Sequence, residues 1–367
     1  MRRGTVGRVA AFLLVAAAAL SVRAEEIPAG LLDEHPGGRV ERARILVTGS
    51  ESMTPFTFAI AKRLAARWTI PEPEIQPVGT QAGFARFCAG IGGEYPDIVA
   101  ATRRIRQSEF DRCLENRIAD IIEVPIGFSA VAFVGRRVDA PVALTPRIIY
   151  QAVAAEVPQG QDLVVNPYQR WREIDKSLPA DEIRLLLPSA STGTHNFFDD
   201  VFLQGGCRKF SVIRLTFDAR DRVRLCIKPR SDGRVVDLGV AYDEILPQTL
   251  AESPAGTIGI LPYFVALAHQ DRLRILPVNG ILPSAETIIN DSYEGVHTLY
   301  YYVKRAHMRD HEGNGVVRGL RQFIVEATGE EARGTDGYLD DGGLIPLPAA
   351  QRLQQRRAAL RLERFSR

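Results

Sequence analysis

The chain has 367 residues, 46% of them hydrophobic and 25% charged, and its 46 Lys and Arg residues nearly balance 44 Asp and Glu residues, giving a formal charge of +2. This balance excludes a nucleic-acid-binding protein that relies on bulk positive charge. At roughly 100 to 200 residues per domain, the length predicts two compact units. Few of the basic residues are lysines, so we expect an anion site to use guanidinium, hydroxyl or backbone donors. The lysines are Lys62, Lys176, Lys209, Lys228 and Lys304.

Residues 1–24 have the pattern of an export signal. A basic start is followed by an apolar run from Val9 to Leu20 and then by Val22-Arg23-Ala24, which suits a signal peptidase. The apolar run of 12 residues is shorter than the ~20 that a membrane-spanning helix needs. Removal of the signal would lower the formal charge to −2. No cysteine precedes Cys88, so we expect a soluble periplasmic protein without a lipid or membrane anchor.

The four cysteines are an even number, which suits disulfides in an exported protein. Four cysteines allow three connectivities, and proximity along the chain favours Cys88–Cys113 and Cys207–Cys226. A metal site is the alternative, but the chain has no C-x-x-C motif and no His near a cysteine at ligand spacing. We therefore predict disulfides and expect neither a metal nor another cofactor.

Strand and helix patterns alternate after a lead segment at 25–43. Ile45 to Val47 predicts a strand, and Phe56, Ile60, Leu64 and Trp68 repeat at the four-residue spacing of a buried helical face. Thr54 suits the cap of this helix and Pro55 its first position. The pattern continues through strands at 74–78, 97–99 and 121–124 and helices at 82–89 and 108–116. This rhythm predicts an α/β fold with a parallel-rich sheet.

A second unit is expected to begin near Phe128, with a strand at 129–134, a strand at 184–187 and a helix from Asn196 to Leu203. Further strands are predicted at 256–261 and 297–303, and a helix at 315–327. The tail from Gln351 carries six Arg and one Glu, which favours a solvated helix or a frayed end over a membrane-binding element.

Three segments each combine a strand, a Ser/Thr/Gly turn and a helix start. They lie at 48–55, 79–84 and 189–195. Helix starts expose unpaired N–H groups, hydroxyls add uncharged donors, and glycine lets a ligand approach the backbone. A single Ser or Thr at such a place is usually just a helix cap. Their recurrence, with Arg103 after a strand, favours an oxyanion site, although Arg103 and Arg104 could instead form ion pairs with Glu109 or Asp111.

Enzyme signatures are poor. The chain has no G-x-S-x-G motif, no phosphate-loop motif and no H-E-x-x-H motif. His307 and His311 lie four residues apart, but the following Glu-Gly-Asn-Gly favours a loop over a metal-binding helix. We expect a binding protein rather than an enzyme.

Further motifs lie in order along most of residues 44 to 348. They are Thr48-Gly49-Ser50 to Phe56, Val78-Gly79-Thr80 to Gly90, Pro96-Asp97-Ile98 to Arg104 with Glu109 and Cys113, Asn166-Pro167-Tyr168 with Trp171, Thr192-Gly193-Thr194 to Phe198, Gly206-Cys207, Gly256 to Gly259, and Gly337 to Leu347. With these motifs the chain resembles the periplasmic phosphate-binding proteins of ABC importers. The resemblance implies a type II periplasmic binding fold, in which two α/β lobes enclose a ligand cleft. Lobe 1 would comprise 44–126 and 297–348, lobe 2 would comprise 127–296, and 349–367 would form a basic tail.

The resemblance also implies a set of ligand-binding residues and the two disulfides that chain proximity favours. By matched position, the oxyanion would be held by Ser50, Ser52, Thr80, Thr102, Arg103, Thr192, Gly193 and Thr194. The chain departs from the family pattern at Pro188, at 235–242 and at Glu51, where small hydroxyl residues are usual. Glu51 either points outward or points into the site, where it would repel a dianion or accept the proton of a protonated one.

The leading hypothesis is a monomeric solute-binding protein that captures inorganic phosphate or a related oxyanion and delivers it to the permease of an ABC importer. The alternative is an envelope sensor or adhesion-type protein with the same fold and a different or lost ligand. An exported hydrolase has little support, because no nucleophile and base can be paired.

Overall fold

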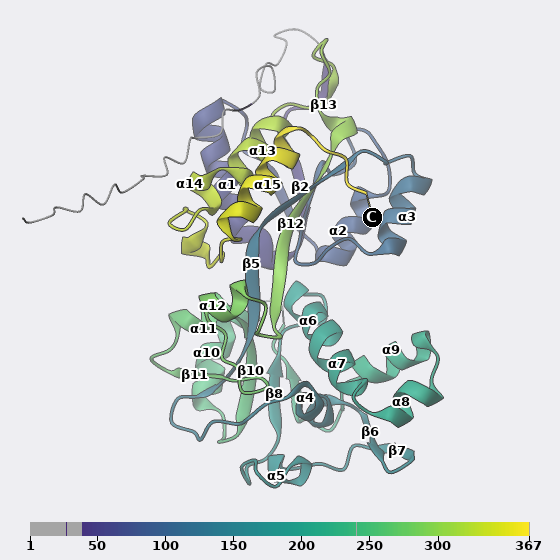
Figure 1. The fold of residues 1–367 in the computed structure, drawn as a ribbon, viewed down its shortest axis with the longest axis vertical. Coiled ribbons are helices and arrows are strands. Elements are labelled where there is room, and N and C mark those ends of the chain that lie inside the picture. The colour runs from purple at the N-terminus through teal and green to yellow at the C-terminus, as the bar shows by residue number, and fades with distance from the viewer. Residues whose placement is uncertain (1–26, 28–38, 240, 367) are drawn as a thin grey trace, which may run out of the picture.

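Two long strands run from one lobe of the molecule into the other, and the remaining elements pack around the two ends of this pair (Figure 1). The computed structural model describes residue 27, residues 39–239 and residues 241–366. The predicted export signal at 1–24 and most of the lead at 25–43 lie outside the described residues.

The crossing strands are β5 (Ile121–Arg136) and β12 (Val296–Lys304), which pair antiparallel over the whole of β12. The sequence predicted two short strands in place of β5, and this was wrong. Pro125 interrupts the pattern because it lacks an N–H. The structure accommodates Pro125 at a register shift between Leu299 and Tyr300, so the strand continues through it.

Lobe 1 contains a mixed sheet with the strand order β3-β2-β4-β12-β5, in which β2 pairs parallel with β3 and β4, whereas β12 pairs antiparallel with β4 and β5. Its elements before β5 are β1 (Val40–Arg42), β2 (Leu46–Gly49), η1 (Glu51–Met53), α1 (Thr54–Trp68), β3 (Glu74–Pro77), α2 (Thr80–Phe87), β4 (Ile98–Ala101) and α3 (Gln107–Glu115). The elements after β12 are η3 (Arg305–His307), β13 (Gly315–Val317), α13 (Leu320–Thr328), α14 (Glu330–Arg333), η4 (Asp340–Gly342) and α15 (Ala349–Leu360).

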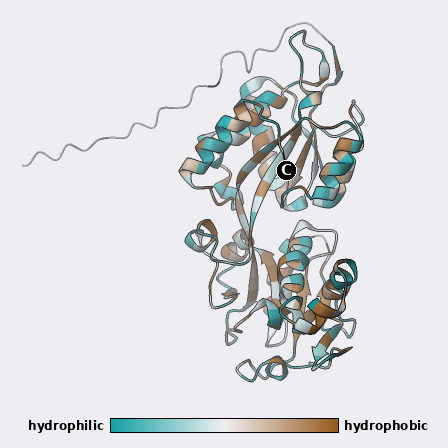
Figure 2. Cartoon of the chain, turned by 45° about the vertical axis from the view of Figure 1, so that its right-hand side comes forward, coloured by the Kyte–Doolittle hydropathy of each residue, from teal (hydrophilic) through white to brown (hydrophobic). Residues whose placement is uncertain are grey.

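Alternating side chains of the lobe 1 sheet build two cores. Ile98 and Ala100 belong to the core with α1, α13 and α15, whereas Val99 belongs to the core with α2 and α3. Successive residues of a strand point to opposite faces, so the fully apolar run of β4 marks a strand covered on both sides. Figure 2 shows hydrophobic residues along the strands and hydrophilic residues on outer helical surfaces.

Lobe 2 continues the same sheet in the order β5-β10-β8-β9, with β11 also paired to β5. Its elements are α4 (Pro146–Val153), β6 (Glu156–Gln159), β7 (Asp162–Val165), α5 (Trp171–Ile174), β8 (Arg184–Leu187), α6 (Gly193–Phe198), η2 (Asp199–Leu203), α7 (Gln204–Cys207), α8 (Ser211–Thr216), α9 (Ala219–Ile227), β9 (Val235–Asp237), α10 (Tyr242–Glu252), β10 (Thr257–Pro262), α11 (Tyr263–Ala268), β11 (Leu273–Leu276) and α12 (Ala285–Ile289). One core lies against α4, α6 and η2, and another lies against α10 and α11. The mixed α/β fold with a sheet shared by two lobes confirms the predicted fold class.

The cysteines pair as Cys88–Cys113 and Cys207–Cys226, which confirms the pairing favoured by chain proximity. The first disulfide links the end of α2 to α3 in lobe 1. The second links α7 to α9 and lies in a separate apolar cluster with Tyr150. Each bridge therefore stays within one lobe and leaves the lobes free to move relative to each other.

Several helix boundaries differ from the prediction. A turn at Glu51–Met53 precedes α1, so Thr54 is the first residue of α1 rather than its cap. Helix α6 begins at Gly193, earlier than the predicted start. The predicted helix at 315–327 is wrong at its start, because residues 315–317 pair with β1 as a strand and the helix follows Gly319, which has a φ of 90°.

The C-terminal tail forms a helix with an exposed face, which agrees with one of the two forms that the sequence had suggested, but its other face is packed against lobe 1. Helix α15 packs on α13 and β5, and Phe365 is buried against Phe110 and Tyr302. Buried Arg333 holds the tail by donating to the carbonyls of Arg352 and Pro125 at 2.8 and 2.6 Å. Charge composition alone concealed these apolar and carbonyl contacts.

His307 belongs to a buried polar cluster in lobe 1, not to a metal site. Its Nδ1 lies 2.7 Å from Asp97, and its Nε2 accepts a hydrogen bond from the N–H of Gly92 at 3.2 Å. Since a backbone N–H can only donate, Nε2 carries no proton and the ring is neutral. Burial, followed by the charges of Lys304 and Arg42, lowers the pKa of His307, although Asp97 opposes the shift.

We predict that His307→Gln reduces the pH dependence of stability. The pKa of His307 is depressed in the folded state, so acidification below the ordinary value of about 6.5 protonates the unfolded chain first and reduces the free energy of unfolding. At pH 7.5 the free energy of unfolding of the variant should be about 1–3 kcal/mol lower than that of the wild type, because Asp97 and Gly92 lose their partner. Below pH 6.5 the free energy of unfolding should fall less steeply in the variant than in the wild type. Urea unfolding at several pH values measures both quantities. The control, exposed His311→Gln, should match the wild type at every pH.

Candidate anion-binding site between the lobes

The turns predicted to bind an anion come together where the two lobes touch. Ser50 follows β2 and Thr102 follows β4 in lobe 1, whereas Gly193 begins α6 in lobe 2. A Cβ added to Gly193 would lie 2.6 Å from the Ser50 Oγ and 3.0 Å from the Thr102 Oγ1. Glycine at this position therefore allows the lobes to approach more closely than a side chain would.

Hydroxyl groups from both lobes surround this contact. Thr80 lies 3.3 Å from Thr102 between their hydroxyl oxygens, and Ser52 lies 3.4 Å from Thr194 across the lobes. Ser50, Thr80, Thr102 and Thr194 are all buried. The Ser50 Oγ has no hydrogen-bond partner within the described part of the chain, although buried polar atoms nearly always have one. The cluster is thus poor in water and retains an unused donor.

Thr192 serves first as a helix cap. Its Oγ1 accepts a hydrogen bond from the N–H of His195 at 3.2 Å and donates to the carbonyl of Ser189 at 2.8 Å. This arrangement positions the start of α6 against lobe 1. Thr192 therefore fixes the backbone that presents Gly193 and Thr194.

Arg103 forms the ion pair that the sequence left open. Both terminal nitrogens of its guanidinium donate to Glu109, at 2.7 and 2.8 Å, and the group also lies over the Phe84 ring. One terminal nitrogen also donates to the carbonyl of Arg104. A guanidinium has five N–H groups, so Arg103 keeps others free and can face a ligand while Glu109 holds it.

Glu51 lies at the edge of the hydroxyl cluster. Its Oε1 is 4.0 Å from the position of a Cβ added to Gly79, at the start of α2, and its Oε2 is buried without a hydrogen-bond partner among the described residues. Burial raises the pKa of the Glu51 carboxyl above its usual range, while a hydrogen bond to its own backbone opposes this. A carboxyl in this state readily takes or shares a proton.

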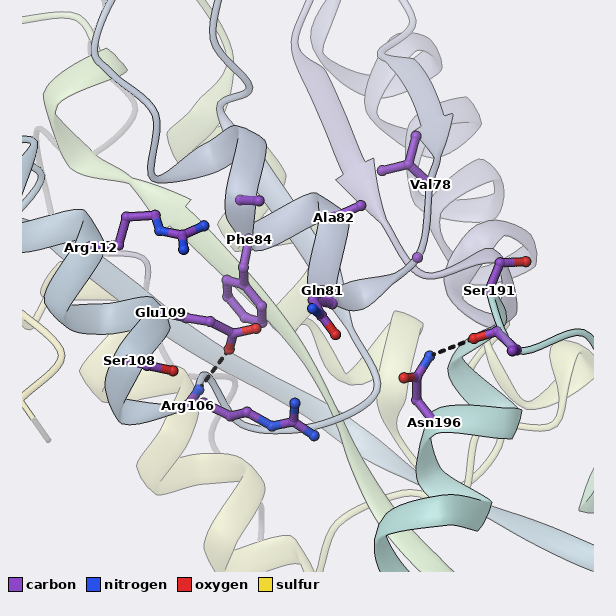
Figure 3. Close-up of a pocket in the computed structure, with 13 residues that line it drawn as sticks. Val78, Gln81, Ala82, Phe84, Arg106, Ser108, Glu109, Arg112, Ser191 and Asn196 are labelled. Atoms are coloured by element: carbon purple, nitrogen blue, oxygen red, sulfur yellow. Dashed lines mark hydrogen bonds between the residues drawn. The ribbon is translucent and has the colours of Figure 1, made fainter. Parts of the chain in front are cut away.

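Two cavities adjoin the cluster. The inner one has a volume of about 30 Å³ and is lined by residues of both lobes: Thr80, Gln81, Thr102, Arg103, Gly193, Asn196, Phe197 and Asp200. The outer one, drawn in Figure 3, has a volume of about 460 Å³ and lies between α2, α3 and the loop that leads into α6. The inner cavity brings Thr80, Thr102, Arg103 and Gly193 together, whereas Ser50, Ser52, Thr192 and Thr194 are not in its wall.

Tyr242 was missed by sequence reasoning. Its hydroxyl donates to the Thr194 Oγ1 at 2.7 Å from the first residue of α10, and its side chain is buried. Because Thr194 accepts from Tyr242, its own proton is free to be donated toward Ser52 or a ligand. Tyr242 lies at the end of the 235–242 stretch, where the chain departs from the family pattern, and only the fold reveals its contact.

An ion pair joins the lobes beside the inner cavity. Arg106 of lobe 1 donates to Asp200 of lobe 2 at 2.5 Å. The neighbouring Asp199 is half-buried, with its Oδ1 3.5 Å from the His195 Nε2. Burial raises the pKa of Asp199 to about 6, with Asp200 adding to the rise and His195 opposing it. This side of the interface therefore combines a formed ion pair with a carboxyl that titrates near neutral pH.

Within the described residues, no group of three His, Cys, Asp or Glu side chains could hold a metal ion. In the same part of the chain, no helix combines the length and hydrophobicity needed to cross a membrane.

Comparison with known proteins agrees with this geometry. A family model described as a PBP superfamily domain matches residues 35–331. The chain belongs to the PBP superfamily. Among the superfamily members similar to it, Protein SphX of Synechococcus elongatus is 22% identical over 315 residues, covering 84% of this chain and 79% of SphX. The phosphate-binding protein PstS of Staphylococcus haemolyticus is 23% identical over 310 residues, covering 82% and 80%.

The fold of this superfamily member is also found in solved structures. An ABC-type phosphate transport receptor from Vibrio cholerae superimposes with a TM-score of 0.59 at 15% identity, covering 83% of this chain and all of the other. At this identity the likeness establishes the fold, and ligand chemistry has to be argued from the residues of the site.

We predict that Tyr242→Phe weakens binding of an oxyanion at this interface about five- to tenfold, because loss of one buried hydrogen bond costs about 1 kcal/mol and leaves the Thr194 hydroxyl misdirected. Titration calorimetry with inorganic phosphate as the probe measures the effect. The control is Tyr293→Phe, which removes a similarly buried hydroxyl that donates to Val131. It should reduce stability by a similar amount without changing affinity, and equal affinity losses in both variants would contradict the assignment.

Proposed function

We propose that the protein is a soluble periplasmic solute-binding protein that captures an oxyanion, with inorganic phosphate as the leading ligand, and delivers it as a monomer to the permease of an ABC importer. Superfamily membership, the phosphate-binding relatives and the export pattern at 1–24 support this proposal. The proposed ligand set is the one implied by the resemblance, and Tyr242 orients Thr194 within it. The set comprises Ser50, Ser52, Thr80, Thr102, Arg103, Thr192, Gly193 and Thr194.

The observation that carries the proposal is the unpartnered, buried hydroxyl of Ser50 at the contact between the lobes. A buried hydroxyl without a partner costs about 1–3 kcal/mol. An oxyanion accepts several hydrogen bonds, so it would satisfy Ser50 together with Thr102 and the N–H groups at the starts of α2 and α6. An apolar ligand would leave these donors unpaired.

Binding would work through closure of the cleft. An anion that touches Thr80 on one lobe and Gly193 on the other stabilises the closed arrangement and shifts an existing equilibrium toward it. No covalent step is needed, and the site offers no paired nucleophile and base. The proposed role is therefore capture and release.

We predict that the wild type binds phosphate and that Gly193→Ala weakens this binding at least tenfold. The added methyl group would meet Ser50 and Thr102 and keep the lobes apart. Gly205→Ala is the matched control in the same lobe, because a Cβ there meets no atom within 4 Å. Calorimetry gives the affinities and thermal shift gives the stabilisation of the folded state. The proposal fails if millimolar phosphate neither binds nor stabilises the wild type.

We also propose Glu51 as the acceptor of a ligand proton, on the basis of its buried and unpartnered Oε2. Hydrogen phosphate has a proton to donate at neutral pH, whereas sulfate has none. Glu51→Gln replaces the acceptor by an amide donor, so phosphate affinity should fall about tenfold while sulfate affinity rises. Exposed Glu74→Gln should leave both affinities unchanged. An unchanged phosphate-to-sulfate ratio in Glu51→Gln would show that the carboxyl does not touch the ligand.

A further inference from the structure

The outer cavity opens directly beside the proposed phosphate site. Its wall is formed by α2 and α3 of lobe 1 and, from lobe 2, by Ala190 and Ser191 of the loop before α6 and Asn196 of α6, so it lies across the same interface as the hydroxyl cluster. Its volume of about 460 Å³ falls in the range of small-molecule sites, which is about 300–1,000 Å³. Inorganic phosphate alone leaves most of this space unused.

Two side chains separate the outer cavity from the inner one, because Gln81 and Asn196 are the lining residues that the cavities share. Asn196 is held in place, since its Nδ2 donates to the carbonyl of Thr192 at 2.7 Å. The Gln81 side chain is exposed and makes no hydrogen bond to any described residue. Figure 3 shows Gln81 between the α3 residues on one side and Ser191 and Asn196 on the other.

The size of the inner cavity indicates what happens when an anion enters. Its volume of about 30 Å³ is two to three times the ~10–15 Å³ that a cavity needs to hold one water molecule, and a tetrahedral oxyanion of five heavy atoms needs more space than that. Part of the wall must therefore move on binding. Gln81 is the wall residue that moves at least cost, because no hydrogen bond holds it. Its displacement joins the two cavities.

The outer cavity offers polar and positively charged surroundings. The carboxylate of Glu109 is already occupied by Arg103 and by the N–H of Arg106, and the Arg106 guanidinium is paired with Asp200. The guanidinium of Arg112 is exposed and has no hydrogen bond or ion pair with any described residue. Ser108 and Ser191 add hydroxyl groups. After the existing pairs are counted, one positive charge remains, in a wall that is polar and apolar in similar measure.

We propose that the protein binds phosphate monoesters of small hydroxycarboxylic acids, with the phosphoryl group in the hydroxyl cluster, the organic part in the outer cavity and the carboxylate at Arg112. The proposal rests on the proposed function for the phosphoryl group. It extends that function from a single inorganic ion to a class of organic phosphates, and it gives Gln81 the role of a movable wall between the two halves of the site.

Calorimetry with three probes tests the proposal: inorganic phosphate, 3-phosphoglycerate, and glycerol 3-phosphate, which has the same length without the carboxylate. The wild type should bind 3-phosphoglycerate within tenfold of phosphate and bind glycerol 3-phosphate more weakly. Arg112→Gln should lower the affinity for 3-phosphoglycerate about tenfold and change the affinities for inorganic phosphate and glycerol 3-phosphate less than twofold. Exposed Arg172→Gln, in lobe 2, is the control and should change none of them.

A second variant tests the cavity itself. Ser108→Trp fills the outer space from α3, so both esters should lose at least tenfold in affinity while phosphate binding persists. Binding of phosphate without either ester by the wild type overturns this inference and leaves the proposed function standing. If the wild type binds none of the three probes, both this inference and the proposed function are overturned. Equal ester affinities in the wild type and in Arg112→Gln show that the carboxylate is not held there.

Discussion

The pairing of β12 with β5 determines where the two lobes meet. The C-terminal part of β12 also pairs with β4 of lobe 1, and β5 from Val131 onward also pairs with β10 of lobe 2. Between these regions, residues 127–130 and 296–299 pair with each other, and Phe128 also forms an isolated antiparallel bridge with Ile345. The register shift at Leu299/Tyr300 lies at the edge of this stretch. Bending of the two-stranded connection changes the distance between the lobes without disturbing either core, because each disulfide also stays within one lobe.

This geometry explains how a nearly neutral protein can offer an anion site. Charge on the whole surface would attract anions of every kind from a distance, whereas donors gathered at the interface act after water has been excluded. The buried hydroxyls of Ser50, Thr80 and Thr102 carry no charge and need no counterion. Arg103 is the positively charged residue in the wall of the inner cavity, and its ion pair with Glu109 neutralises that charge. Selectivity then depends on the pattern of donors and acceptors more than on net charge.

Much of this arrangement could be predicted from local sequence patterns. Apolar spacing and cap residues act over only a few positions of the chain. They therefore predict helix α1, strand β4 and the turns at 48–55 and 189–195 from the sequence alone. The continuous course of β5 could not be predicted from the sequence, because a proline normally ends a strand. The register shift that accommodates Pro125 comes from the pairing of β5 with β12. The start of β13 was missed for a related reason: its strand character comes from β1, which is more than 270 residues away in the chain.

In the site, too, local sequence patterns predicted some residues, whereas contacts between distant segments could not be predicted. The turns at 48–55, 79–84 and 189–195 were predicted because they combine hydroxyl residues with helix starts, and the resemblance implied the individual ligand residues. The alternative partner of Arg103, Glu109, was visible six positions away. Tyr242 and Asp200 could not be predicted, since their contacts with Thr194 and Arg106 join segments that the fold alone brings together. The excess of Arg in the tail concealed the burial of Phe365, because the mean charge of a segment does not show which few of its residues pack.

The position of Phe365 has a consequence for how the protein is made. Phe365 completes the apolar layer formed by Phe110 and Tyr302, and its N–H donates to the carbonyl of Ile121. Lobe 2 is one continuous stretch of chain, so its core needs no residue beyond that stretch. Lobe 1 needs residues from both sides of lobe 2, so its core stays incomplete until Phe365 has been synthesised. Truncation before Phe365 would therefore damage the half of the protein whose first strands were synthesised before lobe 2.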